Sequence, residues 1–184
     1  MAIARVASWA FPAVARAERV TFADLVRDHQ DEVFGLALRM LGDRDAAHDV
    51  TATVFLKAYR AFDRFDRSRP ARPWLLRIAV NESISAGRSV SRDLSRRAPA
   101  EAALDLPDRS PVPEEEALAR EERLLVRDAV ARLAEPYRTV TVLRYFSGLA
   151  VGEIAQITGR PASTVGVQLL RARGLLRAVL GDER

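Results

Sequence analysis

Three polar residues near the carboxyl end of the chain, Thr164, Gln168 and Arg171, recur at intervals of four and three, which places them on one face of a helix. A glutamine amide can form two hydrogen bonds with adenine, and an arginine can bind guanine or a phosphate. Arg173 adds a second cation close by. These residue types predict a contact with duplex DNA.

The surrounding segment, EIAQITGRPASTVGVQLLRAR (153–173), has the pattern of two short helices on either side of a turn. Gly159 permits the left-handed backbone of such a turn, and Pro161 suits the first turn of the next helix. The predicted inward positions are Ile154, Ala155, Val165, Leu169, Ala172, Leu176 and Val179. The pattern predicts a helix-turn-helix, whose second helix normally enters the major groove. The alternative is a helical hairpin that serves only packing.

The most outward strip of the second helix is apolar. Its members are Ser163, Val167, Leu170, Gly174 and Ala178. Gly166 supplies no charge either. This strip favours a weak reader of DNA or a surface for a protein partner, and the sequence leaves both open.

The rest of the chain must position this motif, and it also has helical periodicity. Thr21 can cap a first helix with Asp24 as its capping-box partner, and Gly42 ends that helix. Asp43 or Asp45 can cap a second helix. The predicted apolar positions are Phe22, Leu25, Val26, Val33, Phe34, Ala37, Leu38 and Leu41 in the first helix, and Ala47, Val50, Val54, Phe55, Ala58, Tyr59 and Phe62 in the second.

A third helix is predicted from about Pro73, with Trp74, Leu75, Ile78 and Ala79 buried. Later helices carry an apolar stripe of Leu124, Leu125, Ala129, Val130 and Leu133, and a segment from Pro136 to about Phe146. No useful alternation of strand-forming residues occurs, so the expected fold class is all-α.

Changes in texture along the chain predict its domain organisation. Residues 1–19 read as a disordered leader; they loosely imitate a secretory signal, but Pro12 and the short apolar run weigh against one. A helical domain over 20–88 and a second over 114–181, which contains the helix-turn-helix, are joined by the segment 89–113, rich in proline, serine and charge. That segment predicts a flexible linker, and hence two domains on a tether rather than one bundle.

Composition excludes several function classes. The chain has no cysteine, which rules out disulfides and thiolate metal sites and fits a cytoplasmic protein. His29 and His48 have no metal-binding partners in the sequence. No nucleophile–histidine–acid set, phosphate loop or metal spacing predicts an enzyme or a cofactor. The net charge of +4 is weak evidence for nucleic acid, and no window predicts membrane insertion.

Three segments together resemble the extracytoplasmic-function (ECF) sigma factors of bacterial RNA polymerase. They are AAHDVTATVFLKAYRAF, RPWLLRIAVNESIS and LAEPYRTVTVLRYFSGLAVGEIAQITGRPASTVGVQLLRAR. The resemblance implies that 20–88 is a sigma-two domain, which binds the beta-prime clamp helices of core RNA polymerase and opens the downstream promoter element. It implies that 114–181 is a sigma-four domain, which reads the upstream element beside the beta flap. An anti-sigma factor is a further implied partner.

The resemblance also implies roles for individual residues. Asp49, Thr51 and Phe55 match the polymerase-binding helix of the family, and Asn81, Arg88 and Arg92 match its basic edge that meets promoter DNA. In the reading helix the implied DNA contacts are Thr164, Gln168, Arg171 and Arg173.

This chain departs from the family pattern in three places. His48, Ala52 and Thr53 stand where the family has Glu, Gln and Glu, which implies an altered grip on polymerase. The basic edge after Asn81 is thinner, and Gly166 and Gln168 replace common cations. Trp74 could wedge into the promoter fork or belong to the core.

The sequence therefore predicts a sigma factor that binds core RNA polymerase and directs promoter recognition. One alternative is a sigma-like, protein-binding regulator that has lost DNA reading. The other is a helix-turn-helix regulator that binds operator DNA as a dimer.

Overall fold

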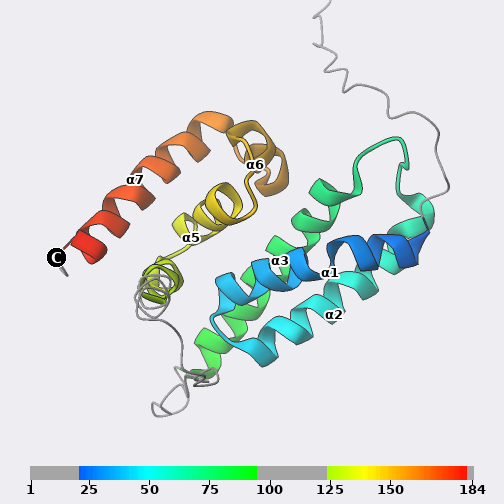
Figure 1. The fold of residues 1–184 in the computed structure, drawn as a ribbon, viewed down its shortest axis with the longest axis horizontal. Coiled ribbons are helices and arrows are strands. Elements are labelled where there is room, and N and C mark those ends of the chain that lie inside the picture. Colours follow the sequence, from blue (N-terminus) through cyan, green and yellow to red (C-terminus); the bar gives the residue numbers. More distant parts are fainter. Residues whose placement is uncertain (1–20, 95–123, 182–184) are drawn as a thin grey trace, which may run out of the picture.

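The computed structural model describes residues 21–94 and 124–181, and those residues form helices without a strand (Figure 1). The elements are α1 Phe22–Leu41, α2 Arg44–Ala61, the short η1 Phe62–Arg64, α3 Ala71–Leu94, a helix over residues 124–132, α5 Tyr137–Thr141, the π-helical η2 Val142–Phe146, α6 Val151–Thr158 and α7 Ala162–Gly181. The predicted all-α class is confirmed. The leader 1–19 and the segment with Glu114, Glu115 and Glu116 lie outside the described residues.

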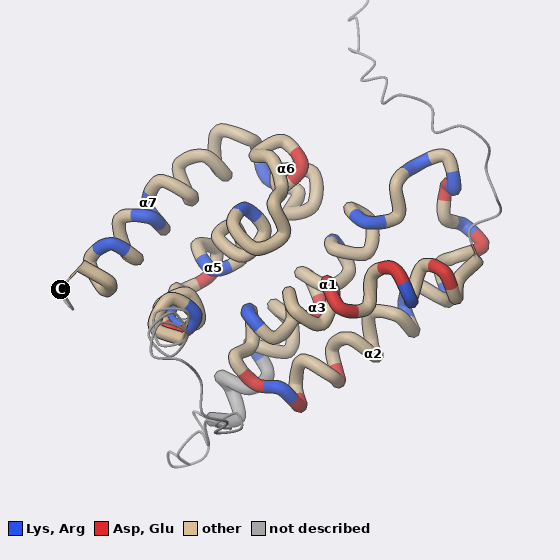
Figure 2. Tube along the Cα trace, viewed as in Figure 1, with Lys and Arg blue, Asp and Glu red and all other residues tan. Residues whose placement is uncertain are grey.

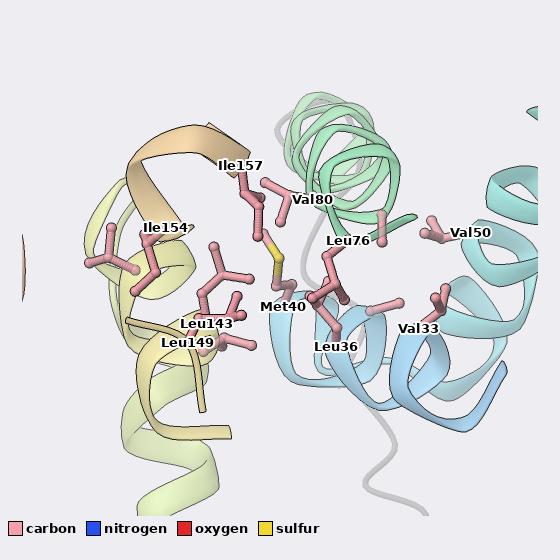
Figure 3. Close-up of a cluster of buried hydrophobic side chains, with 14 of the residues drawn as sticks. Val33, Leu36, Met40, Val50, Leu76, Val80, Leu143, Leu149, Ile154 and Ile157 are labelled. Atoms are coloured by element: carbon pink, nitrogen blue, oxygen red, sulfur yellow. The ribbon is translucent and has the colours of Figure 1, made fainter. Parts of the chain in front are cut away.

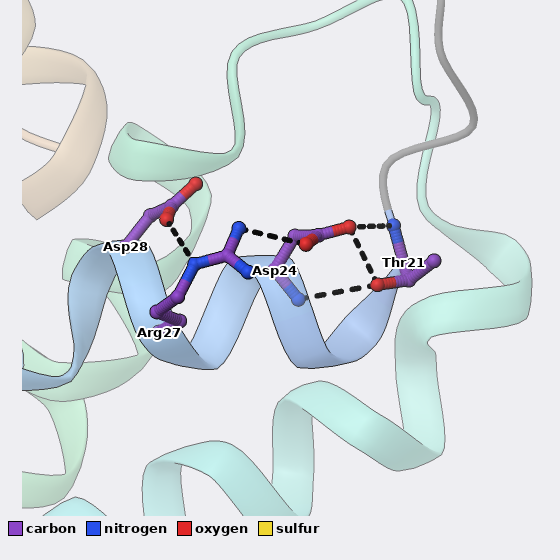
Figure 4. A network of polar contacts seen from close by, with 4 residues as sticks. All are labelled: Thr21, Asp24, Arg27 and Asp28. Carbon is purple, nitrogen blue, oxygen red and sulfur yellow. Dashed lines mark hydrogen bonds and ion pairs between the residues drawn. The ribbon is translucent and has the colours of Figure 1, made fainter.

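Local capping explains where α1 begins and ends. The Asp24 backbone N–H donates to the Thr21 hydroxyl over 3.2 Å, and the Thr21 N–H donates to the Asp24 carboxylate over 3.1 Å (Figure 4). Arg27 extends this network by pairing with Asp24 over 2.7 Å. At the other end Gly42 has a φ of 74°, the left-handed region that glycine tolerates. Both predicted boundaries of α1 are confirmed.

The next helix starts directly after this turn. The Asp43 carboxylate accepts the Ala46 N–H over 2.7 Å, so Asp43 rather than Asp45 is the cap of α2. Helices α1, α2 and α3 pack on one another and form the first domain. Tyr59 is 64% exposed, so its predicted burial is wrong; its ring instead meets Phe22 edge-on at the surface.

The second domain is built from the helix over 124–132 and from α5 to α7. Ala129, Val130 and Leu133 are buried as predicted. Leu124 and Leu125 are exposed, and so is Val179 near the end of α7, which contradicts the predicted stripes. Their helices extend past the packed part of the domain. The core instead takes in Leu143, Leu149 and Ile157, which the predicted stripes did not include.

The two domains share one hydrophobic core. Figure 3 shows Met40 of α1 and Val80 of α3 beside Ile157 of α6, with Leu143 close by. Leu36 also belongs to this cluster. Because α3 packs against α6 and α1 against η2, the two helical domains that the sequence predicted are packed against one another.

Helix α3 reaches into the segment 89–113 that the sequence predicted as a flexible linker. Helix α3 continues through Leu94, so residues 89–94 of the segment 89–113 are helical. The remainder of that segment lies outside the described residues.

An arginine of each domain donates a hydrogen bond to a backbone carbonyl of the other domain. Arg72 of α3 forms a forked pair with Glu32 over 2.6–3.0 Å and also donates to the Ser147 carbonyl in the second domain. The bond to Glu32 raises the pKa of Arg72 above its usual value. In the opposite direction, Arg138 of α5 donates to the Met40 carbonyl over 2.6 Å. These bonds use carbonyls at the ends of helical segments, which lack partners within the helix.

A third arginine contributes an aromatic contact. The guanidinium carbon of Arg39 lies 4.7 Å from the centre of the Phe146 ring, across the boundary between the domains. Burial lowers the pKa of Arg39. A partly desolvated cation over an aromatic face is attracted more strongly than an exposed one. The contact therefore adds to the packing of α1 against η2.

Candidate nucleic-acid interface

The helix-turn-helix is formed as the sequence predicted. Glu153 accepts the Ala150 N–H over 2.7 Å and so caps α6. Gly159 ends α6 with a φ of 67°, and the Arg160 N–H closes the turn on the Ala155 carbonyl over 3.1 Å. Ile154 is fully buried in the core that joins the two helices. This packing fixes the angle at which α7 presents its outer face.

Three of the predicted DNA-binding residues lie together. Thr164, Gln168 and Arg171 line a hollow of about 330 Å³ between α7 and the start of α5. The Gln168 side-chain carbonyl accepts a bond from Arg160 over 3.3 Å, so its amide nitrogen is the group that could donate to a base edge. Ser163 and Tyr137 line the same hollow; Tyr137 was missed because it belongs to another helix.

Arg173 lies apart from this group. Two residues along a helix correspond to about 200° of rotation, which takes Arg173 away from Arg171 and out of the hollow. The apolar strip lies between them, with Val167 49% and Leu170 63% exposed. Charge on α7 is nevertheless of one sign, since its charged residues are arginines (Figure 2). Arg173 can meet a phosphate only on the other flank of the helix.

The predicted polymerase-binding residues of α2 do not share one face. Asp49 is exposed, and no hydrogen bond or ion pair of its carboxylate occurs among the described residues. The Thr51 hydroxyl donates back to the Ala47 carbonyl over 2.7 Å. Phe55 is partly buried against the core, so it packs the domain.

Leu56, absent from the predicted set, is 50% exposed and lies seven residues from Asp49, on the same side of α2. A leucine outside the apolar stripe of its helix was the available signal for such a position.

On α3 the predicted DNA-binding residues face the other domain. Asn81 and Arg88 are exposed and line a pocket of about 370 Å³ together with Thr158 and Arg160. The side chain of Arg92 lies outside the described part of α3.

Trp74 belongs to the core side of the first domain. Its ring stacks on Phe65 with centroids 4.5 Å apart, and it packs against a small cluster around Leu75. This contact supports the core interpretation of Trp74.

Two absences hold for residues 21–94 and 124–181. No group of three or more histidine, aspartate or glutamate side chains is arranged there as a metal site. No helix in that part of the chain is both long and apolar enough to cross a membrane.

Comparison with known proteins matches both domains. The family described as sigma-70 region 2 matches residues 25–93, and the family described as sigma-70 region 4 matches residues 123–176. The ECF RNA polymerase sigma factor SigW of Bacillus subtilis (strain 168) is 32% identical over 92% of this chain and 94% of its own length. The chain belongs to the ECF sigma factors of the sigma-70 family.

Two further sigma-factor relatives are similar to this chain over most of its length. The ECF RNA polymerase sigma-E factor of Escherichia coli (strain K12) is 34% identical over 87% of this chain and 86% of its own length. CnrH, solved with the cytosolic domain of CnrY, is 29% identical and superposes with a TM-score of 0.62 over 89% of each chain.

The fold alone is shared with RpoE of Bartonella quintana, solved with the anti-sigma factor NepR. That structure is 21% identical, has a TM-score of 0.69, and covers 89% of this chain and 98% of its own. The two family matches and the similarity to SigW make the protein a transcription initiation factor that directs promoter recognition, and not an enzyme.

Proposed function

We propose that this sigma factor, which acts in the cytoplasm, binds core RNA polymerase through the exposed face of α2 that carries Asp49 and Leu56. The observation that carries the proposal is the position of this face: it points away from the core that α1 and α3 build. An exposed carboxylate beside an exposed leucine offers both charge and apolar area to a partner. Thr51 and Phe55 support the face from within.

Substitution of Asp49 by arginine tests this surface. Because Asp49 is exposed, Asp49→Arg should leave the helical content unchanged while it abolishes co-purification with core RNA polymerase. Asp31→Arg is the matched control, since Asp31 is an exposed aspartate of α1. Undiminished co-purification of Asp49→Arg would remove polymerase binding from this face.

Promoter DNA is the second proposed partner. Thr164, Gln168 and Arg171 line one hollow on α7, which supports base contact there, whereas Arg173 is left to phosphate contact. Asn81, Arg88 and Arg92 form the proposed contact with the downstream element. The pocket lined by Asn81 and Arg88 is closed on its other side by the second domain. We therefore propose that the domains separate before both can reach a promoter.

A protein partner is the competing use of α7. The exposed Val167 and Leu170 favour it, and an anti-sigma factor is the kind of partner the family implies. Leu170→Ser distinguishes the two uses, because Leu170 is 63% exposed, does not line that hollow and is replaced without a new charge: a DNA reader should keep most of its DNA affinity, while a protein-binding regulator should lose its partner.

A further inference from the structure

The turn of the helix-turn-helix fixes the orientation of a side chain on α7. Arg160, between α6 and α7, donates from its guanidinium to the side-chain oxygen of Gln168 over 3.3 Å. A guanidinium carries N–H donors and no acceptor. The end of the Gln168 amide that faces Arg160 must therefore be the oxygen, and the amide nitrogen is left for another partner.

The backbone of the turn holds Arg160 in place for this bond. Gly159 has a φ of 67°, and the Arg160 N–H donates to the Ala155 carbonyl over 3.1 Å. The ring of Pro161 fixes the backbone that follows. Arg160 and Gln168 are both half-buried. A side chain that starts from a fixed backbone and is partly enclosed loses less freedom when it forms a hydrogen bond.

The bonded oxygen is not available in the hollow where base contact is proposed. Gln168 lines that hollow with Thr164 and Arg171, whereas Arg160 does not line it. The oxygen of Gln168 is thus bonded to a residue outside the hollow. Within residues 21–94 and 124–181, no protein group accepts a hydrogen bond from the amide nitrogen. The side chain therefore offers two N–H donors to a base edge.

This restriction changes which base suits Gln168. A glutamine that uses both its oxygen and its nitrogen pairs with the N6 amino group and N7 of adenine. Guanine instead presents two acceptors in the major groove, O6 and N7, while cytosine presents an amino donor. Two N–H donors match guanine. The positive charge of Arg160 favours the same edge, because arginine itself binds guanine O6 and N7.

We propose that Arg160 is a positioning residue that determines base specificity: by holding the oxygen of Gln168, it makes this side chain select guanine rather than adenine at one position of the upstream promoter element. The inference rests on the proposed function, in which α7 contacts promoter DNA through Thr164, Gln168 and Arg171. It adds the identity of one base and the residue that sets it.

Selection of promoter sequences by the full chain bound to core RNA polymerase tests this. The library is a duplex promoter with a randomised upstream element, and bound sequences are read by sequencing. We expect the wild type to favour guanine over adenine by about fivefold or more at one position, which Gln168→Ala identifies by losing the preference there. Arg160→Met should favour adenine at that same position, because both ends of the amide become available.

Further variants separate positioning from a structural role. Arg160→Lys retains a donor and should keep the guanine preference. The double variant Arg160→Met/Gln168→Ala should match Gln168→Ala at the identified position. Arg132→Met is the control, since Arg132 is an exposed arginine outside the helix-turn-helix and should leave every position unchanged.

The outcomes distinguish this inference from the proposed function. If Gln168→Ala loses a preference for guanine that Arg160→Met retains, or if Arg160→Met weakens all positions of the upstream element equally, the role of Arg160 in specificity is overturned while base contact by α7 stands. If Gln168→Ala alters no position, the proposed base contact by Gln168 fails, and this inference fails with it.

Discussion

Arg138 offers the sharpest test of how firmly the two domains are docked. Its guanidinium donates to the Met40 carbonyl in the first domain over 2.6 Å and to the Leu133 carbonyl in its own domain over 2.9 Å. Arg138→Met keeps the apolar stem of the side chain and removes both bonds. A hydrogen bond with a charged partner contributes about 1.5–3 kcal/mol. The bond to Met40 should therefore favour the docked form by about 2 kcal/mol, which is roughly 30-fold in the equilibrium between docked and separated domains.

The absence of cysteine makes this equilibrium measurable. Asp45→Cys in α2 and Gly174→Cys in α7 place two fluorophores on exposed positions of opposite domains, and the space beside Gly174 is open. Energy transfer between them should fall when the domains separate in urea. With a slope of about 1–2 kcal/mol per M, the loss of about 2 kcal/mol lowers the midpoint of that transition by roughly 1–2 M.

Circular dichroism in the same titration separates docking from folding. The helical signal of Arg138→Met should change less than the energy transfer, because only the bond to Leu133 lies within a domain. Arg132→Met is the control, an exposed arginine on the preceding helix. Two results would show that the bond from Arg138 to the Met40 carbonyl does not stabilise the docked form. One is an energy-transfer midpoint of Arg138→Met at the same urea concentration as that of the wild type. The other is an equal shift of the midpoint in Arg132→Met.

Three further predictions concern α7, α1 and the core. A side chain at position 166 meets open space. Gly166→Lys should therefore raise DNA affinity and steepen its salt dependence by about 0.9 log unit per log unit of salt concentration, whereas Gly181→Lys should not. Filter binding at several salt concentrations checks this. Hydrogen bonds from the Thr21 hydroxyl and backbone hold the pKa of Asp24 below its usual value of 3.8. The ionised Asp24 carboxylate therefore stabilises α1 above pH 3.8, and this stabilisation is lost as the pH falls through the lowered pKa. The melting temperature of Asp24→Asn should therefore fall less than that of the wild type as the pH is lowered. An equal fall in the two proteins would contradict a stabilising role of the Asp24 carboxylate at the start of α1. Ile154 is fully buried. Ile154→Ala should therefore lower the free energy of unfolding by about 2–5 kcal/mol and Ile154→Val by about 0.5–1.5 kcal/mol, both measured by urea denaturation. Equal losses in the two variants would show that no cavity forms.

Local features of the fold could be predicted from the sequence because each depends on a few neighbouring residues. The capping box of Thr21 and Asp24 and the turn at Gly159 are set by side-chain bonds or backbone freedom within one turn. Hydrophobic periodicity likewise identified the inward faces of Val165 and Leu169. These signals need no knowledge of the rest of the molecule.

The contact between domains could not be predicted in the same way. Leu36 and Met40 of α1, and Leu76 and Val80 of α3, lie beside the predicted apolar stripes and form a second buried face. Periodicity shows that a face is apolar but not which element covers it. Arginines such as Arg138 are usually solvated, so their bonds to distant carbonyls leave no pattern in the sequence.

The candidate site residues also differ in whether local spacing alone could predict their positions. Thr164, Gln168 and Arg171 share a helix face by spacing alone, and the structure places them in one hollow. Phe55 matches the polymerase-binding pattern of the family, yet it is partly buried, since it packs against two apolar clusters. Leu56 lies outside the predicted apolar stripe of its helix, which was the available signal, and the structure shows that it is 50% exposed.

Run-off transcription with purified core RNA polymerase on genomic DNA fragments tests the central claim, promoter-specific initiation by this sigma factor, most directly. We expect discrete transcripts that depend on the full chain and that disappear when the Asp49→Arg protein replaces it. Transcripts that are the same with and without the protein, at concentrations where it co-purifies with core enzyme, would show that it does not direct promoter-specific initiation.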